Sequence, residues 1–553
     1  MPVDSLYPPQ QTLADALATA TAHHQAGRLP QAEQIYRQIL QQQPQQVDAL
    51  NLLGVIACQK GRLDEGIALY RQALAQRPGY VAARENLSVA LWKLGKQLVE
   101  EAIASYSQII TFQPDSEQAY HNLGAILLEQ GKPDEALSYY LQALSIRPDD
   151  AAMLSNIGTI LQQQGKTETA IVYHRRALAI RPNYPEALVN LGTALQDQGH
   201  FREALDCFNR ALDLNPNDPN ARYNRSLVWL TEGDYRRGFP EYEWRLKTRE
   251  FPPCPFRQPI WDGADLTGRT ILLHAEQGLG DTIQFIRYAA IVAQRGGRLV
   301  LTCHEPLIRL LSAIPAIDQI VPLGHPVPDF HVYAPLMSLP GILGTTVETV
   351  PASVPYLTPP ADSKVTLASV GSPQRNSRDR SQQTTPTMRQ PSHLNVGIVW
   401  SGGHLYKKNQ SRSCPLIHFQ SLLKLPHVTF YSLQKGIAQT NLTELQWETQ
   451  IHDLSPQLRD MGDTAAAIAQ LDLVITVDTS IAHLAGALGK PVWVLLTFLP
   501  DWRWMLHRDD TPWYPTMRLF RQTQDGNWEG VLERVAHELR AVVEANHPLS
   551  PTP

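Results

Sequence analysis

Seven glycines recur through the first half of this chain at intervals of 34, 34, 36, 34, 34 and 34 residues. A period of 34 residues is typical of tetratricopeptide repeats, in which two helices are joined by a tight turn. The glycines are Gly27, Gly61, Gly95, Gly131, Gly165, Gly199 and Gly233.

Other positions keep the same period. A small residue follows each glycine, an aromatic ring or a histidine stands four positions later, and a proline closes six of the units. Small side chains let the helices approach closely, glycine turns the chain and proline ends the second helix. The small residues are Ala32, Gly66, Ala102, Ala136, Ala170, Ala204 and Gly238, and the rings are Tyr36, Tyr70, Tyr106, Tyr140, His174, Phe208 and Tyr242. We therefore predict an α-solenoid of about seven repeats over residues 11–250, of a kind that usually binds other proteins.

Composition narrows the function classes. The net charge of -5 and the absence of a basic stripe argue against a nucleic-acid partner. No signal peptide is visible in Met1–Gln10, and no apolar stretch approaches a membrane span, so we expect a cytoplasmic protein without an integral membrane segment. Five scattered cysteines indicate buried thiols rather than a disulfide framework or a zinc site.

The periodicity changes after a proline-rich connector at residues 251–269. A strand at 270–274, a glycine turn at 278–281, a helix at 282–294 and a strand at 298–302 make a βαβ unit of a parallel sheet. We predict a first α/β lobe over residues 270–358, a linker rich in Pro, Ser, Gln and Arg over 359–394, and a second α/β lobe over 395–545. The second lobe has predicted strands at 395–400, 428–433, 473–477 and 491–496, and a cleft is expected between the two lobes.

Ligands of open parallel sheets bind beyond the carboxyl ends of the strands, where helix N-termini present free N–H groups. Three segments place glycine or polar residues there: 278–282, 401–413 and 478–483. We expect these segments to line one site.

The segment Asp478-Thr479-Ser480 stands between an apolar strand and an alanine-rich helix. Its amides are suited to bind a diphosphate, although Asp478 or Thr479 could equally serve only as a helix cap. His483 could donate to a phosphate or sugar oxygen, or be a structural histidine. Among the loop cations, Arg412 is suited to stabilise a diphosphate leaving group, whereas Lys407 and Lys408 fit a solvated surface better.

Asp281 lies in the first glycine turn, where a carboxylate could take a proton from an acceptor hydroxyl. It could also simply cap the following helix. His274 and Glu276 lie on the same loop and are alternative bases. No Asp-x-Asp triplet follows a strand, so we expect neither a metal nor another cofactor.

At these positions the chain resembles a known family. Asp478-Thr-Ser-Ile-Ala-His483, with Gly486, Ala487, Gly489 and Pro491, resembles the donor-site motif of family 9 glycosyltransferases, the heptosyltransferase group with a GT-B fold. The Gly280-Asp281 turn matches their N-terminal turn, whose aspartate is regarded as the catalytic base. The segments 259–262, 274–282, 433–436, 500–504 and 513–520 resemble the C-terminal region of bacterial tetratricopeptide glycosyltransferases.

The resemblance implies a GT-B-like pair of Rossmann-type domains, with the acceptor on the first lobe and the nucleotide sugar on the second. It implies an inverting hexosyl- or heptosyltransferase in which Asp281 is the base, Arg412, Ser413 and the amides of Thr479 and Ser480 hold the diphosphate, and Asp478 binds sugar hydroxyls. His483 belongs to the same donor set, and the supporting residues are Gly280, Thr282, Glu276 and Lys435. Heptosyltransferases lack the repeat array, and Arg412 replaces their phosphate-loop lysine, so an ADP-heptose donor does not follow.

The domain order also resembles that of O-linked N-acetylglucosamine transferases. One asparagine per repeat recurs two positions before the small residue of the first helix, and its amide can hold a peptide backbone. Asparagine is also common at this position in repeats that bind other ligands or none. The asparagines are Asn86, Asn122, Asn156, Asn190 and Asn224.

The leading hypothesis is a glycosyltransferase that uses a nucleotide sugar and recruits a protein acceptor or partner through its array. A non-catalytic scaffold with a degenerate nucleotide-binding domain is the alternative from another class. A lipid-linked or surface glycan acceptor is a third possibility. Trp502 and Trp504 could stack on a sugar, although buried packing is the preferred interpretation. The donor, the acceptor and the oligomeric state are not determined by the sequence.

Overall fold

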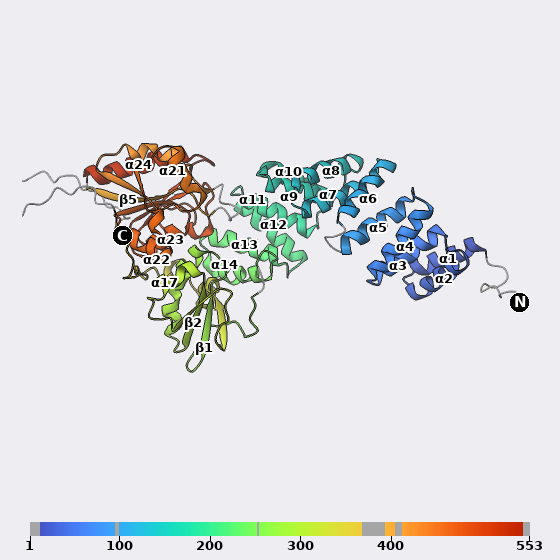
Figure 1. Cartoon of the computed structure of the whole chain (residues 1–553), viewed down its shortest axis with the longest axis horizontal. Coiled ribbons are helices and arrows are strands. Elements are labelled where there is room, and N and C mark those ends of the chain that lie inside the picture. The colour runs from blue at the N-terminus through green and yellow to red at the C-terminus, as the bar shows by residue number, and fades with distance from the viewer. Residues whose placement is uncertain (1–11, 95–98, 252–253, 368–392, 404–411, 546–553) are drawn as a thin grey trace, which may run out of the picture. The chain divides into compact units, whose positions relative to one another are not determined.

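The computed structural model of the chain describes residues 12–94, 99–251, 254–367, 393–403 and 412–545. Two compact units divide the chain at residue 214, and we call residues 1–214 the N-terminal unit and residues 215–553 the C-terminal unit (Figure 1). Met1–Gln10, Lys407, Lys408, most of the predicted linker at 359–394 and the tail lie outside the described residues.

The N-terminal unit consists of helices that pair in sequence order, and wherever the connection within a pair is described, the second helix follows the first through a tight turn. This confirms the predicted solenoid of tetratricopeptide repeats. The helices are α1 (Leu13–Gln25), α2 (Leu29–Gln42), α3 (Val47–Gln59), α4 (Leu63–Gln76), α5 (Val81–Leu94), α6 (Val99–Phe112), α7 (Glu117–Glu129), α8 (Pro133–Ile146), α9 (Ala151–Gln163), α10 (Thr167–Ile180), α11 (Pro185–Gln196) and α12 (Phe201–Leu214).

The repeat period reflects two local requirements. Gly95 lies outside the described residues, and each described glycine between paired helices adopts a left-handed backbone, for example with φ of 78° at Gly61, which residues with a side chain rarely adopt. The periodic ring packs on a small residue of the preceding helix. A Cβ atom added at Gly54 would lie 2.6 Å from the ring of Tyr70, and one at Gly192 would lie 2.6 Å from the ring of Phe208. The rings are therefore buried at every described repeat.

The C-terminal unit begins with the last repeat and continues into the first lobe. The last repeat comprises α13 (Pro219–Glu232), α14 (Tyr235–Tyr242) and the 3-10 helix η2 (Glu243–Lys247). The first sheet is entirely parallel, with order β3-β2-β1-β4. Its strands are β1 (Thr270–His274), β2 (Arg298–Cys303), β3 (Gln319–Pro322) and β4 (Val332–Pro335), and its helices are α15 (Leu279–Phe285), α16 (Ala289–Ala293), α17 (Ile308–Leu311) and α18 (Leu339–Ile342).

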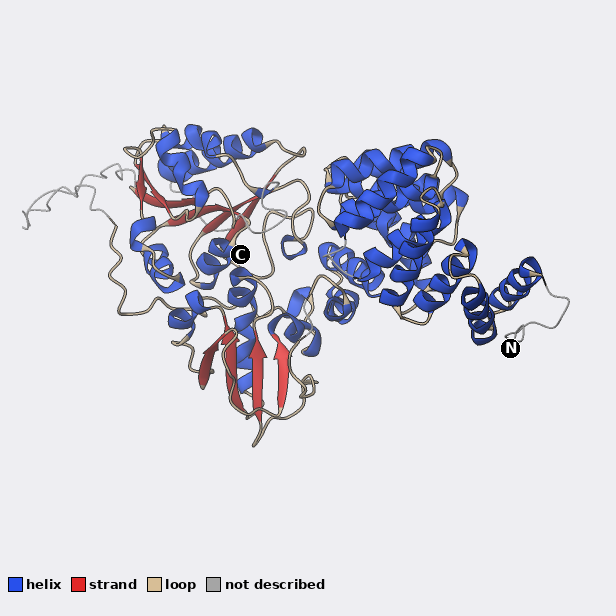
Figure 2. Cartoon of the chain, turned by 45° about the vertical axis from the view of Figure 1, so that its right-hand side comes forward, coloured by secondary structure: helices blue, strands red, loops and turns tan. Residues whose placement is uncertain are grey.

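The second sheet is also parallel, with order β10-β9-β8-β5-β6-β7, and Figure 2 shows it as a sheet separate from the first. Its strands are β5 (Leu394–Val399), β6 (Val428–Ser432), β7 (Ile451–Asp453), β8 (Leu473–Val477), β9 (Val492–Leu496) and β10 (Met517–Arg521). Its helices are α20 (Gln420–Leu423), α21 (Asn441–Glu444), α22 (Met461–Ala469), α23 (Ser480–Ala487) and α24 (Trp528–Ala545).

Strand order places a switch point in each sheet. The direction of winding reverses between β1 and β4 in the first sheet and between β5 and β8 in the second. Parallel sheets bind their ligands at the carboxyl ends of the two strands that flank such a reversal. A ligand site is therefore expected at the carboxyl ends of β1, β4, β5 and β8.

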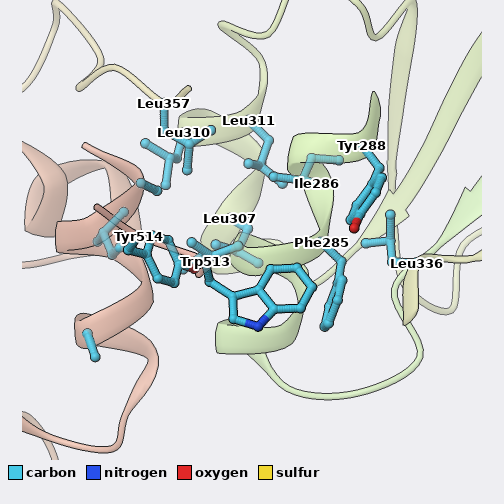
Figure 3. Packing of buried hydrophobic residues seen from close by; sticks show 14 of the residues in the cluster. Phe285, Ile286, Tyr288, Leu307, Leu310, Leu311, Leu336, Leu357, Trp513 and Tyr514 are labelled. Carbon is cyan, nitrogen blue, oxygen red and sulfur yellow. The ribbon is translucent and has the colours of Figure 1, made fainter. Parts of the chain in front are cut away.

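An aromatic cluster joins the last repeat to both lobes. The indole N–H of Trp513 donates to the Tyr235 hydroxyl at 3.0 Å, and the rings of Phe285 and Trp513 lie 5.6 Å apart. Figure 3 shows Trp513 of the second lobe beside Phe285 of the first. Trp502 and Trp504 are buried, as the packing interpretation requires. The last repeat thus shares one hydrophobic core with the α/β lobes.

His174 occupies the ring position of the fifth repeat. From its surroundings we predict that the repeat array loses folding stability in acid. It is fully buried, its ring nitrogens have no hydrogen-bond partner in the described part of the chain, and burial lowers its pKa to about 4. Unfolded histidine takes up a proton near pH 6.5, so the wild type should lose stability as pH falls from 6.5 towards 4. His174→Tyr introduces the tyrosine that five other repeats have at this position and should be more stable than the wild type at pH 5 by about 2 kcal/mol.

Denaturant unfolding followed by circular dichroism at pH 5 and pH 7 measures this gain, which should shrink at the higher pH. Exposed His200→Tyr is the matched control, and it should show no comparable pH-dependent gain. An equal change in both variants would contradict the assignment to His174.

Candidate functional site

Asp281 lies in the first turn of α15, the helix that follows β1. Gly278 precedes the helix, and its backbone N–H donates to Asp281 Oδ2 at 2.9 Å. Asp281 therefore caps the first turn of α15, as one of the two sequence interpretations expects. Its side chain keeps 23% of its exposure, so capping leaves part of the carboxylate accessible.

Arg503 of the second lobe reaches Asp281 of the first. Its Nη2 lies 2.5 Å from Asp281 Oδ1, its Nη1 lies 2.7 Å from Asp501 Oδ1, and its Nε donates to Gln284 Oε1 at 2.9 Å. Burial by itself lowers the pKa of Arg503, but Asp501 and Asp281 raise it well above its usual value. One buried guanidinium is thus shared by carboxylates from both lobes.

Gly280 brings the N-terminus of α15 against the N-terminus of α23. A Cβ atom at Gly280 would lie 3.0 Å from His483 Cδ2 and 3.3 Å from Ser480 Cα. His483 Nδ1 lies 3.0 Å from the Tyr514 hydroxyl, and burial together with Arg503 holds the pKa of His483 well below its usual value. The imidazole is therefore neutral at neutral pH and presents a hydrogen-bonding ring beside the turn.

The donor-side residues predicted from sequence come together at the carboxyl ends of β5 and β8. Arg412 Nη1 lies 3.8 Å from Asp478 Oδ2, and the hydroxyls of Ser401 and Ser413 lie 3.0 Å apart. Thr479 caps α23 by accepting from the Ile481 N–H at 3.2 Å, so that amide already has a partner. The structure assigns a capping contact to Thr479 and leaves Asp478 facing Arg412.

Asp478 is the carboxyl with the most perturbed surroundings in this region. Burial raises its pKa first and the charge of Asp501 adds to the rise, whereas Arg412 and Arg503 oppose it. Shifts of this kind cluster at functional sites, although structural ion pairs also cause them. The raised pKa marks Asp478 as a group that the fold keeps in an unfavourable electrostatic position.

The supporting residues have varied surroundings. Glu276 forms a two-point ion pair with Arg245 of the last repeat, so one rival base of the sequence analysis is engaged by a cation. The Thr282 hydroxyl donates to the Gly278 carbonyl at 3.2 Å, and Lys435 donates to the Leu458 carbonyl. His274 Nδ1 lies 2.9 Å from the Thr302 hydroxyl.

Three charged residues of this region were not among the sequence candidates: Arg503, Asp501 and Arg245. The first two stand in Pro500-Asp-Trp-Arg-Trp504, an aromatic segment beyond the end of β9. The sequence feature that could have identified Asp501 and Arg503 is a pair of opposite charges within an aromatic segment, because charges that are buried require partners. Arg245 gave no comparable signal, since it follows a helix rich in other charges.

The asparagines of the array are engaged within the protein. Asn86 donates to Asn51 Oδ1 at 2.9 Å, Asn122 donates to the Tyr106 hydroxyl at 3.2 Å, and Asn190 donates to the Thr159 hydroxyl at 3.2 Å. The Asn156 amide lies close enough to Tyr140 to oppose the rise that burial causes in the tyrosine pKa. Asn224 belongs to the C-terminal unit. A peptide role for these amides stays a prediction.

Within the described ranges, we find no gathering of three or more His, Cys, Asp or Glu side chains suited to a metal ion. Among the helices of these ranges, none combines the length and the apolar character of a membrane-spanning segment.

Comparison with known families matches both halves of the chain. Tetratricopeptide repeat models match residues 17–81, 57–127, 117–150 and 149–217. The model of glycosyltransferase family 9 (heptosyltransferase) matches residues 430–498, which begin within β6 and include β8, α23 and β9. The chain therefore combines tetratricopeptide repeats with a segment similar to family 9 glycosyltransferases.

A curated relative and several solved structures are also similar. Protein FlbA of Caulobacter vibrioides is 25% identical over 338 residues, which are 55% of this chain and 52% of FlbA, so the chain spans about half the length of that relative. YrrB, described as a TPR protein with an unusual peptide-binding site, is 17% identical with a TM-score of 0.31, covering 35% of this chain and 98% of YrrB. The pilF protein of Pseudomonas aeruginosa is 18% identical with a TM-score of 0.35, covering 38% of this chain and 94% of pilF.

The raised pKa of Asp478 predicts a pH-dependent stability. The folded state holds this proton more tightly than the unfolded state, so stability falls as pH rises from the ordinary aspartate pKa to the raised one. Asp478→Asn removes the penalty and should stabilise the protein at pH 8 by roughly 1–2 kcal/mol, with little gain at pH 4. Thermal unfolding across this range measures the difference. Exposed Asp525→Asn is the control, and a gain for Asp478→Asn at pH 4 that equals the gain at pH 8 would refute the prediction.

Proposed function

We propose that this protein is an inverting, metal-independent glycosyltransferase of the GT-B type, which moves a sugar from a nucleotide-sugar donor to a hydroxyl acceptor. The observation that carries the proposal is the ion pair between Asp281 and Arg503. Through it, a carboxylate beyond β1 and the Asp478 region beyond β8 border the same junction of the two lobes. The family 9 match over residues 430–498 supports a donor site on the second lobe.

The proposed reaction assigns one task to each side of the junction. Asp281 accepts the proton of the acceptor hydroxyl, whose oxygen then bonds to the anomeric carbon of the donor. The bond from that carbon to the diphosphate breaks, and the nucleoside diphosphate leaves with the bonding electrons. Arg412, Ser413 and the N-terminus of α23 stabilise the leaving charge, while Asp478 and His483 bind sugar hydroxyls.

The contacts of Asp281 are compatible with this task. Each carboxylate oxygen can accept more than one hydrogen bond, so the contacts from Arg503 and Gly278 leave acceptor capacity for a hydroxyl. Its neighbour Glu276 is a poorer candidate, because Arg245 binds both of its oxygens.

The repeat array is proposed to recruit a protein acceptor or partner. Tetratricopeptide stacks present extended surfaces to other proteins. The asparagines from Asn86 to Asn224 are the proposed peptide contacts, and a peptide would replace some of their present hydrogen bonds, such as Asn86 to Asn51.

A non-catalytic scaffold is the second candidate. The observation that favours it is that both oxygens of Asp281 are already bonded inside the protein. Calorimetry with UDP, GDP and ADP separates the two functions, since a nucleotide-sugar enzyme binds at least one nucleoside diphosphate and a pure scaffold binds none.

Asp281→Asn tests the assigned base. We expect transfer, or slow hydrolysis of the donor, to fall by about 10²- to 10⁴-fold, because the amide cannot accept the proton. Nucleotide affinity should change little, since Asp281 belongs to the other lobe. Mass spectrometry with a panel of nucleotide sugars measures the activity.

The matched control is Asp329→Asn, an exposed carboxylate of the first lobe away from the turn. It should retain wild-type activity. Undiminished transfer by Asp281→Asn would rule out this residue as the base.

A further inference from the structure

Arg245 of the last repeat lies at the switch point of the first sheet. Its guanidinium bonds to Glu276, which follows β1, through Nε at 3.1 Å and Nη2 at 2.6 Å. The same Nη2 donates to the Ser338 hydroxyl at 2.8 Å, and Ser338 follows β4. Because β1 and β4 flank the reversal of strand order, this arginine occupies the place where a parallel sheet usually holds a ligand.

The arginine is completely enclosed. Its side chain has 0% exposure, and its Nη1 donates to Glu243 at 2.7 Å and to the Tyr242 carbonyl at 3.2 Å. Ser338 also donates to Glu243 at 2.8 Å, which closes a ring of polar contacts. A buried arginine is tolerated only with such complete pairing, so its position fixes the position of Glu276.

A second contact ties the same loop to the last repeat. Gln277 donates to the Tyr242 hydroxyl at 3.4 Å, so two successive loop residues are held by η2 and α14. The next residue is Gly278, which caps α15 and donates to Asp281. The orientation of Asp281 therefore depends on a loop that the last repeat holds.

We propose that Arg245 is a positioning residue for Asp281, so that the last repeat forms part of the catalytic machinery. This inference rests on the proposed glycosyl transfer. Arg245 holds the loop at Glu276, and Arg503 holds the carboxylate from the second lobe. The donor side lies beyond β8, so Arg245 acts on turnover and not on nucleotide binding.

Three variants of the full-length protein separate positioning from folding. Arg245→Met leaves Glu276 buried without its cation and should lower both Tm and kcat. Glu276→Gln removes the carboxylate. The double variant is neutral at both positions and should regain most of the lost Tm, because neutral replacements of a buried ion pair are often well tolerated. Its kcat should nevertheless stay at least about 10-fold below the wild type, because the loop is no longer fixed.

The experiment measures kcat and KM separately for each variant. Hydrogen exchange of residues 275–285 is a second measurement. In the double variant, KM for the donor should stay within about threefold of the wild type, since the second lobe is unchanged, and exchange over these residues should be faster. Arg222→Met is the control, because this arginine of the same repeat pairs with Glu241 instead of the loop. It should keep wild-type kcat and exchange.

Two results overturn the inference while leaving the proposed function in place: a double variant that regains both Tm and kcat, or one that keeps wild-type exchange over residues 275–285. A wild type that neither transfers nor hydrolyses any nucleotide sugar overturns the proposed function itself. In that case, faster exchange in the double variant would show only that Arg245 holds the loop at Glu276. Unchanged exchange would contradict this structural role of Arg245 as well.

Discussion

The buried guanidinium of Arg503 joins the two lobes at the candidate site. Removing an arginine from water costs several kcal/mol, and the cost is recovered only where hydrogen-bond acceptors, with or without a negative charge, surround the guanidinium. Asp501 supplies one carboxylate locally, and Asp281 supplies the other from the opposite lobe. A second buried arginine, Arg287, repeats the arrangement with neutral partners, because it donates to the Trp513 carbonyl of the second lobe at 2.6 Å. Polar contacts of fixed geometry therefore set the lobe junction, and the aromatic core fills the space beside it.

The parts of the fold that rest on local physics follow from the sequence. Ring packing and left-handed glycines repeat every 34 residues, so the solenoid is predictable, and six continuous apolar runs match observed strands to within one residue. The predicted helix at 282–294 is instead interrupted by a 3-10 turn at Ile286–Tyr288 and begins at Leu279, because Gly278 can serve as its cap. Edge strands such as β7, with three residues, are too short to give a clear pattern.

The candidate site also contains residues that could be predicted from the sequence and residues that could not. Asp281, Asp478 and His483 could be selected from sequence because each follows a strand end in a recognisable motif. Their partners could not be selected, since Arg503 lies 222 residues from Asp281 along the chain and no periodicity connects the two. The capping role of Thr479 illustrates the remaining ambiguity, because a cap and an anion site require the same residue types at a helix N-terminus.

The place where the chain divides, at residue 214, has a consequence for how such proteins diversify. The seventh repeat supplies Tyr235 and Arg245 to the interior of the α/β region, so its sequence is constrained from two directions. In the upstream repeats, the sequence has to satisfy only the packing of each repeat against the adjacent ones. Duplication or deletion of whole 34-residue repeats before residue 215 can therefore change the number of repeats during evolution while the interior of the C-terminal unit stays unchanged.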